Sequence, residues 1–247
     1  MSVSNRLDDT AKVWRFMDLW KFISLLNDNA LTMARIDILE DPYDGQLNPQ
    51  WHDDAKRRIS ERLESDEEQQ KIMDRFDSFL RQGGTDSCGP AYVSCWYTGQ
   101  SSSLAMWKLY CPSGQGVALQ STVGLLKTIQ SEELTLQCGP VEYRTLNRLG
   151  DINDWEKLPF LKRKAYDFER EYRIIGREPW QKSLNKKARD THKQLKIDPS
   201  KLLTKIWAPA GCPTWQMHQL RGLVRQYDIE VVVSRSGIMD DSWGTRG

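Results

Sequence analysis

Hydrophobic residues recur along the chain in short blocks, and their spacing predicts a mixture of strands and helices. Alternating or continuous apolar positions predict strands over 13–17, 30–35, 91–97, 116–120, 135–143, 168–176, 194–197, 204–208 and 230–234. Helical spacing predicts helices over 19–27, 102–110, 122–129, 155–165 and 214–227. No regular strand–helix–strand repeat emerges. The pattern therefore predicts an α+β fold, in which helices pack on a twisted, largely antiparallel sheet.

The segment 51–84 interrupts this pattern because it is rich in charge and has helical spacing. It predicts a helical insertion of two helices that divide near Ser65 and Asp66 and end at Gly83 and Gly84. The polar, basic stretch 177–193 predicts an exposed loop, and the tail 237–247 is expected to fray. No linker is long enough to mark a boundary, so residues 1–247 are expected to form a single domain.

Net charge, cysteine spacing and the distribution of apolar residues argue against several classes of protein. The formal net charge is +1, so the chain lacks the global charge of a nucleic-acid or membrane-surface binder. Five cysteines without CxxC spacing are typical of reduced thiols. We find no signal-peptide pattern and no run of about 20 apolar residues, so we expect a soluble, cytoplasmic protein without membrane attachment.

Several familiar chemistries have no motif here. The chain carries neither a GxxxxGK[ST] phosphate loop nor a glycine-rich dinucleotide fingerprint. Its three histidines lack metal-ligand spacing, and no metal is expected. Asp41 and Asp44 belong to a carboxylate cluster that could hold Mg²⁺ or Ca²⁺. The cluster lacks the calcium-loop pattern, so a solvated turn explains it better.

The segment Phe168–Ile175 carries the most specific pattern. On a strand, Glu169, Glu171 and Arg173 would share one face, since side chains alternate. Neighbouring carboxylates repel, which raises the pKa of one and lets the pair handle a proton or stabilise a cation. A structural alternative uses the same residues, because basic residues at 162–164 could form a charged ladder with them.

Two further features are candidates for a binding pocket. Arg15 lies between Trp14 and Phe16, so on a strand it faces away from both and could bind phosphate or carboxylate. Trp107 and Tyr110 are three residues apart on a predicted helix and could stack on a planar ring. A surface arginine and ordinary core aromatics are the alternatives.

These motifs, taken in order, resemble a bacterial family catalogued as domain of unknown function 2971. The resemblance runs through nearly the whole chain and rests on Trp14-Arg15-Phe16-Met17, Leu25-Leu26 through Asp41-Pro42-Tyr43-Asp44-Gly45, Tyr92-Val93-Ser94-Cys95-Trp96, Met106-Trp107-Lys108-Leu109-Tyr110, Gly116-Val117-Ala118-Leu119 and Phe168-Glu169-Arg170-Glu171-Tyr172-Arg173. The arrangement is more distantly similar to ADP-ribosyltransferase-like folds, several of which are toxins or phage-defence effectors.

The second resemblance implies roles for particular residues. Arg15 would hold the diphosphate or ribose of NAD, Trp107 or Tyr110 would support the nicotinamide ribose, and Glu171 or Glu169 would bind the ribose. The Ser-Thr-Ser motif of many such folds is absent. Ser101-Ser102-Ser103 is a substitute in composition, but it is expected to open a helix.

The leading hypothesis is therefore an enzyme that uses NAD as cosubstrate, transferring ADP-ribose to a protein or nucleic acid or hydrolysing NAD, with a role in bacterial conflict or phage defence and with regulation by a partner. The basic stretch 182–189 could approach an acidic acceptor. One alternative is a non-catalytic module that binds a nucleotide, nucleic acid or protein. A second is a metal-dependent nuclease using Asp41, Asp44 and the glutamates.

Overall fold

The computed structural model describes residues 7–45, 65–81, 88–99, 103–148, 156–179 and 190–237, together with the single positions 53, 57 and 61. The chain divides into two compact units. The first unit comprises Met1–Thr32, Cys95–Ile129 and Gln194–Gly247, and the second comprises Met33–Ser94 and Gln130–Lys193. The expectation of a single domain over 1–247 stays a prediction.

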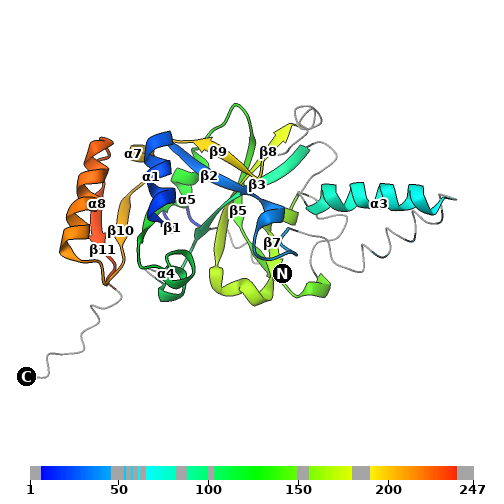
Figure 1. The fold of residues 1–247 in the computed structure, drawn as a ribbon, viewed down its shortest axis with the longest axis horizontal. Coiled ribbons are helices and arrows are strands. Elements are labelled where there is room, and N and C mark those ends of the chain that lie inside the picture. Colours follow the sequence, from blue (N-terminus) through cyan, green and yellow to red (C-terminus); the bar gives the residue numbers. More distant parts are fainter. Residues whose placement is uncertain are drawn as a thin grey trace, which may run out of the picture. The chain divides into compact units, whose positions relative to one another are not determined.

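The strands of the first unit pair in the order β11-β10-β4-β1, and β1 pairs next with β3, of which only the end from Cys95 belongs to this unit. Their bounds are β1 (Lys12–Asp18), β3 (Cys88–Tyr97), β4 (Gly116–Thr122), β10 (Lys205–Ala208) and β11 (Val232–Arg235). β1 pairs with β4 in antiparallel register along its whole length, from Lys12 opposite Thr122 to Asp18 opposite Gly116. β10 and β11 are parallel, and the helix α8 (Thr214–Gln226) lies beside them (Figure 1).

Some of the described helices of the first unit begin at a side-chain cap, whereas others have none. The other helices here are α1 (Leu19–Asp28), α4 (Leu104–Tyr110), α5 (Val123–Lys127) and α7 (Pro199–Leu202). The carboxylate of Asp18 accepts a hydrogen bond from the backbone N–H of Lys21 at 2.8 Å and so caps the start of α1. Asn29 ends α1 in the left-handed conformation, at φ 47°, which asparagine tolerates well.

Aromatic side chains form a hydrophobic cluster in the first unit. The buried members are Trp14, Phe16, Tyr97, Met106, Trp107, Cys111 and Ala118. The rings of Phe16 and Trp107 meet edge to face with centroids 5.1 Å apart. This packing fixes α4 against β1.

The second unit contains an antiparallel pair of strands that are distant in the sequence, together with several short elements. Its elements are η1 (Ile36–Ile38), α3 (Asp66–Arg81), β5 (Thr135–Pro140), β6 (Glu142–Arg144), η2 (Leu146–Arg148), η4 (Leu158–Phe160), β7 (Leu161–Arg163), η5 (Lys164–Glu169) and β8 (Glu171–Pro179). β2 (Ala30–Arg35), β3 and β9 (His192–Lys196) belong partly to each unit. β5 and β8 are antiparallel, whereas β6 and β7 are parallel. Helices with a mostly antiparallel sheet confirm the predicted α+β fold.

Two predicted elements were wrong. The helix expected over 155–165 is replaced, within the described residues, by η4, β7 and the start of η5. Pro159 would fall beyond the first turn of the predicted helix, where its ring and missing N–H disrupt helical hydrogen bonding, whereas it lies in the first turn of η4, which tolerates it. The strand expected from Phe168 begins only at Glu171, because Arg170 adopts the left-handed conformation at φ 39°. Glu169 is therefore not on the strand with Glu171.

The remaining differences are small or fall outside the described residues. α3 begins at Asp66, as predicted, but the first half of the expected insertion, its glycine end and the tail from 238 lie outside those residues. So does the basic stretch 182–189. The expectation of an exposed loop over 177–193 was wrong at both ends, because β8 continues to Pro179 with Arg177 buried, and β9 begins at His192. None of the described helices combines the length and apolar character needed to cross a membrane.

Candidate functional site

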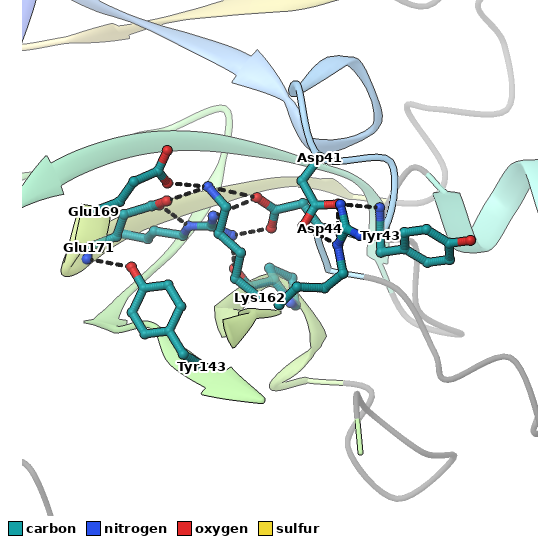
Figure 2. Close-up of polar contacts among 10 residues, drawn as sticks. Asp41, Tyr43, Asp44, Tyr143, Lys162, Glu169 and Glu171 are labelled. Atoms are coloured by element: carbon teal, nitrogen blue, oxygen red, sulfur yellow. Dashed lines mark hydrogen bonds and ion pairs between the residues drawn. The ribbon is translucent and has the colours of Figure 1, made fainter. Parts of the chain in front are cut away.

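A cluster of buried charged side chains lies in the second unit. It consists of Asp44, Lys162, Glu169, Glu171 and Arg173, which we call the charge cluster (Figure 2). A turn, β7, the end of η5 and β8 each contribute to it. Each member is less than a tenth exposed, and Arg173 is fully buried. Charged groups are rarely buried unless they are paired, so the contacts within the cluster decide whether it is stable.

Lys162 connects the acidic residues. Its Nζ donates a hydrogen bond to Oε1 of Glu171 at 2.6 Å and another to Oε2 of Glu169. The same nitrogen lies 3.5 Å from Oδ2 of Asp44. The two glutamates thus meet at one ammonium group although they lie on different elements.

Arg173 forms the second cationic centre. Its guanidinium donates to both carboxylate oxygens of Asp44, at 2.6 and 2.7 Å, in the two-pronged geometry that arginine favours. Its Nε donates to Oε2 of Glu171 at 2.6 Å. Glu171 and Arg173 lie two residues apart on β8, so they share a face as the sequence predicts.

The turn at 41–45 holds Asp44 in place. Gly45 has φ +67°, and a Cβ atom there would lie 2.4 Å from Cδ1 of Ile36, so the position requires glycine. The N–H of Gly45 donates to the carbonyl of Leu161 at 3.1 Å, which joins the turn to β7. Asp41 is buried rather than solvated, and its carboxylate binds Arg163 at 2.7 Å. The expectation of a solvated turn was therefore wrong for both aspartates.

The glutamates have pKa values shifted in opposite directions. Burial, reinforced by a hydrogen bond with Glu171, raises the pKa of Glu169 to about 8. Burial also acts to raise the pKa of Glu171, but Arg173, the hydrogen bond with Glu169 and Lys162 hold it well below its usual range. With Glu169 protonated at neutral pH, two carboxylates balance two cations.

Tyr143 on β6 closes one side of the charge cluster. Its hydroxyl accepts a hydrogen bond from the backbone N–H of Glu171 at 2.8 Å (Figure 2). Burial, followed by the negative charge of Glu171, raises the pKa of Tyr143. The phenol therefore stays protonated and positions the first residue of β8.

Aromatic rings lie at the exposed edge of the cluster. The ammonium of Lys162 lies 4.9 Å from the ring centre of Tyr166, which stacks on Phe168 at a centroid distance of 6.4 Å. Phe168 is 45 % exposed, so this stack reaches the surface. The guanidinium of Arg163 lies 5.0 Å from the ring centre of Tyr43 and 5.5 Å from that of Tyr166.

The carboxylates of the cluster surround cations of the protein itself. Nζ of Lys162 and the guanidinium of Arg173 occupy the positions between Asp44 and the two glutamates. Among the residues that the structure describes, no group of three or more acidic, histidine or cysteine side chains is arranged to hold a metal ion.

The other predicted site residues belong to the first unit. The guanidinium of Arg15 donates to the carbonyl of Thr32 at 2.6 Å, and burial lowers its pKa to about 10. Alternation along β1 points Arg15 away from Phe16, on which Trp107 packs. Trp107 is a core residue, whereas Tyr110 is 40 % exposed. Ser101 and Ser102 lie outside the described residues, and Ser103 makes no side-chain cap for α4.

The pattern of the sequence did not identify Tyr143 or the pairing of Arg173 with Asp44. Asp44 and Arg173 are 129 positions apart, and nothing in the local sequence indicates their contact. The sequence did indicate Lys162, because the charged-ladder alternative places it beside the glutamates. In the structure Lys162 binds both of them.

The chain was compared with protein-family models and with curated proteins, and neither comparison identified a relative. No protein-family model matches the chain, and no curated protein matches it. The resemblance to the family catalogued as domain of unknown function 2971 stays a prediction.

Proposed function

We propose that the protein cleaves the bond between nicotinamide and ribose in NAD, either transferring ADP-ribose to a macromolecule or hydrolysing NAD. One observation carries the proposal: Lys162 holds Glu169 and Glu171 together, and their pKa values are shifted in opposite directions. Pairs of titratable groups with separated pKa values are typical of sites that divide acid and base roles between two carboxyls.

The two glutamates suit different steps of this reaction. The bond from ribose C1′ to the nicotinamide nitrogen breaks, and nicotinamide leaves with the bond electrons as a neutral base. Ionised Glu171 stabilises the oxocarbenium-like ribose that remains. Glu169 keeps its proton at neutral pH and donates a hydrogen bond to a ribose hydroxyl. Water or an acceptor then bonds to C1′ and releases one proton.

The edge of the charge cluster supplies contacts for the rest of the substrate. Phe168 and Tyr166 offer a ring face for stacking beside Lys162. Arg163 keeps its positive charge, since its hydrogen bond to Asp41 raises its pKa, and it lies next to the same rings. Both oxygens of Glu171 are engaged by cations, so substrate must displace Lys162 when it binds.

Nicotinamide release from NAD⁺, measured by mass spectrometry, tests the proposal. Wild-type protein should release nicotinamide, and Glu171→Gln should reduce release by about 10²-fold or more, as expected when one electrostatic stabiliser is lost. Glu142→Gln is the matched control, because the Glu142 side chain is 61 % exposed and its pairing with Arg144 is a surface contact. Faster release with host lysate would indicate a protein or nucleic-acid acceptor.

A non-catalytic binding module is the second candidate, and a specific observation favours it. Every carboxylate of the charge cluster is paired, and the cluster is less than a tenth exposed, as in a purely structural core. On this account neither wild type nor Glu171→Gln releases nicotinamide, while the variant still loses stability. A role in bacterial conflict or phage defence rests on the distant resemblance to ADP-ribosyltransferase-like folds alone, and regulation by a partner stays a prediction.

A further inference from the structure

A cavity of about 450 Å³ lies within the first unit. α8 forms one wall, the loop before β4 and the residues after β10 form another, and Leu19 at the start of α1 contributes to the rim. The volume falls in the range of cavities that take small organic ligands. None of the residues of the charge cluster lines it, so the cavity is a separate feature.

The residues that line the cavity in the described part of the chain carry no charge. The described lining residues are apolar side chains, glycines, one cysteine and four glutamines. An ionised group entering such a site would lose hydration without gaining an opposite charge. The cavity therefore favours an uncharged ligand.

The glutamines define what hydrogen bonds the ligand can make. Gln115, Gln216, Gln219 and Gln226 line the cavity and each carries a carbonyl acceptor next to an amide donor, although the carbonyl of Gln216 already accepts a weak hydrogen bond from the Cys212 thiol at 3.6 Å. A matching ligand has a donor and an acceptor side by side, as a carboxamide or the edge of a nucleobase does. Trp215 is 64 % exposed at this site, and its indole offers a face for a flat ring.

Packing does not explain why position 222 is a glycine, because the space beside it is open. Gly222 lies in the middle of α8, where glycine costs about 0.5–1 kcal/mol relative to alanine. A Cβ atom added there would meet nothing within 4 Å. Neither backbone conformation nor a close neighbour explains glycine at this position, whereas an open wall for a ligand does.

We infer that this cavity binds an uncharged heteroaromatic ring bearing a carboxamide or an equivalent donor–acceptor edge. The floor of Val117, Ala208 and Leu220 buries the ring, and the glutamine amides bind its polar edge. The inference does not depend on NAD cleavage, because neither glutamate of the charge cluster lines the cavity.

Two matched pairs of probes test it: nicotinamide against nicotinate, and adenosine against adenosine monophosphate. Isothermal titration should show binding of at least one uncharged probe, with at least about tenfold weaker binding of its charged counterpart. Failure of both uncharged probes, or equal affinity for a charged counterpart, would overturn the inference.

Gly222→Leu locates the binding. The leucine side chain should fill the cavity and weaken binding by at least about tenfold, while α8 is retained or strengthened because leucine favours helices. Gly211→Ala is the control, since its added Cβ also meets nothing within 4 Å and Gly211 does not line the cavity. Unchanged affinity in Gly222→Leu, with both variants folded by circular dichroism, would place the ligand elsewhere and overturn the assignment.

Discussion

Glu169 and Glu171 lie on different elements, one at the end of η5 and the other at the start of β8, yet both accept a hydrogen bond from Nζ of Lys162. The left-handed conformation of Arg170 between them turns the chain, so the second carboxylate is not simply one strand repeat from the first. The ammonium group, rather than strand alternation, brings the two glutamates together.

Removing this ammonium should be costly. We expect Lys162→Met to lower the free energy of unfolding by about 3 kcal/mol or more, since losing one partner leaves buried acidic groups unbalanced. Urea denaturation at pH 7 measures the loss. Lys201→Met is the control, because Lys201 is 85 % exposed and its pairing with Asp198 is a surface contact. Equal, small losses in the two variants would show that Lys162 does not balance the cluster.

The raised pKa of Glu169 predicts an unusual dependence of stability on pH. The folded protein binds this proton more tightly than the unfolded chain, whose glutamate has the ordinary value of 4.5. The contribution is therefore fully present below pH 4.5 and is lost as pH rises toward about 8. The contribution of Glu171 changes in a lower pH range. Because its pKa is depressed in the folded state, its ionised form stabilises the fold above pH 4.5, and that stability is lost as pH falls.

Glu169→Gln isolates the upper window, since glutamine resembles the protonated acid. We expect the free energy of unfolding of wild type to fall more steeply than that of the variant between about pH 5 and pH 8. The two slopes should differ by at most the slope that one bound proton produces. Urea titrations at several pH values measure both slopes. Parallel curves would contradict the assignment of the raised pKa to Glu169.

Much of the fold could be predicted because its signals are local. β1 and α1 follow from alternation and an apolar stripe. The α+β class follows from the order of such elements. The helix predicted over 155–165 failed because apolar spacing alone does not distinguish a helix from successive short turns, and Pro159 decides the outcome.

The candidate site was predictable only in part. The glutamates have a sequence signal in their spacing, and Lys162 lies close to them in the chain. The partner Asp44 lies 129 residues from Arg173, and its pairing depends on the turn that Gly45 allows. Contacts of this kind arise from tertiary packing, so local pattern could not reveal them.

Lysine should not substitute for Arg173, although it keeps the positive charge. The guanidinium of Arg173 binds Asp44 through two nitrogens and Glu171 through a third, and a single ammonium cannot reproduce this geometry. We expect Arg173→Lys to lower the midpoint of urea denaturation by a clear margin, corresponding to about 2–4 kcal/mol. Arg144→Lys, at a partly exposed pair with Glu142, should change it little. Similar midpoints for both variants would argue that charge alone matters.

Two buried tryptophans should respond differently to phenylalanine. The indole N–H of Trp14 donates to the carbonyl of Gly99 at 3.1 Å, whereas the buried N–H of Trp107 has no hydrogen-bond partner among the described residues. Trp14→Phe should therefore lose about 1 kcal/mol more stability than Trp107→Phe, because only the first breaks a hydrogen bond. Thermal and urea unfolding of both variants test the difference, and a larger loss in Trp107→Phe would reverse the interpretation.

The proposed activity depends above all on the opposed ionisation of the glutamate pair in the charge cluster. Carbon-13 NMR of the side-chain carboxyls, assigned with Glu169→Gln and Glu171→Gln, measures both pKa values directly. We expect one carboxyl that titrates near pH 8 and disappears in Glu169→Gln, and another that stays ionised well below pH 4.5 and disappears in Glu171→Gln. Two ordinary titrations near pH 4.5 would contradict this expectation and leave the cluster as a set of structural ion pairs.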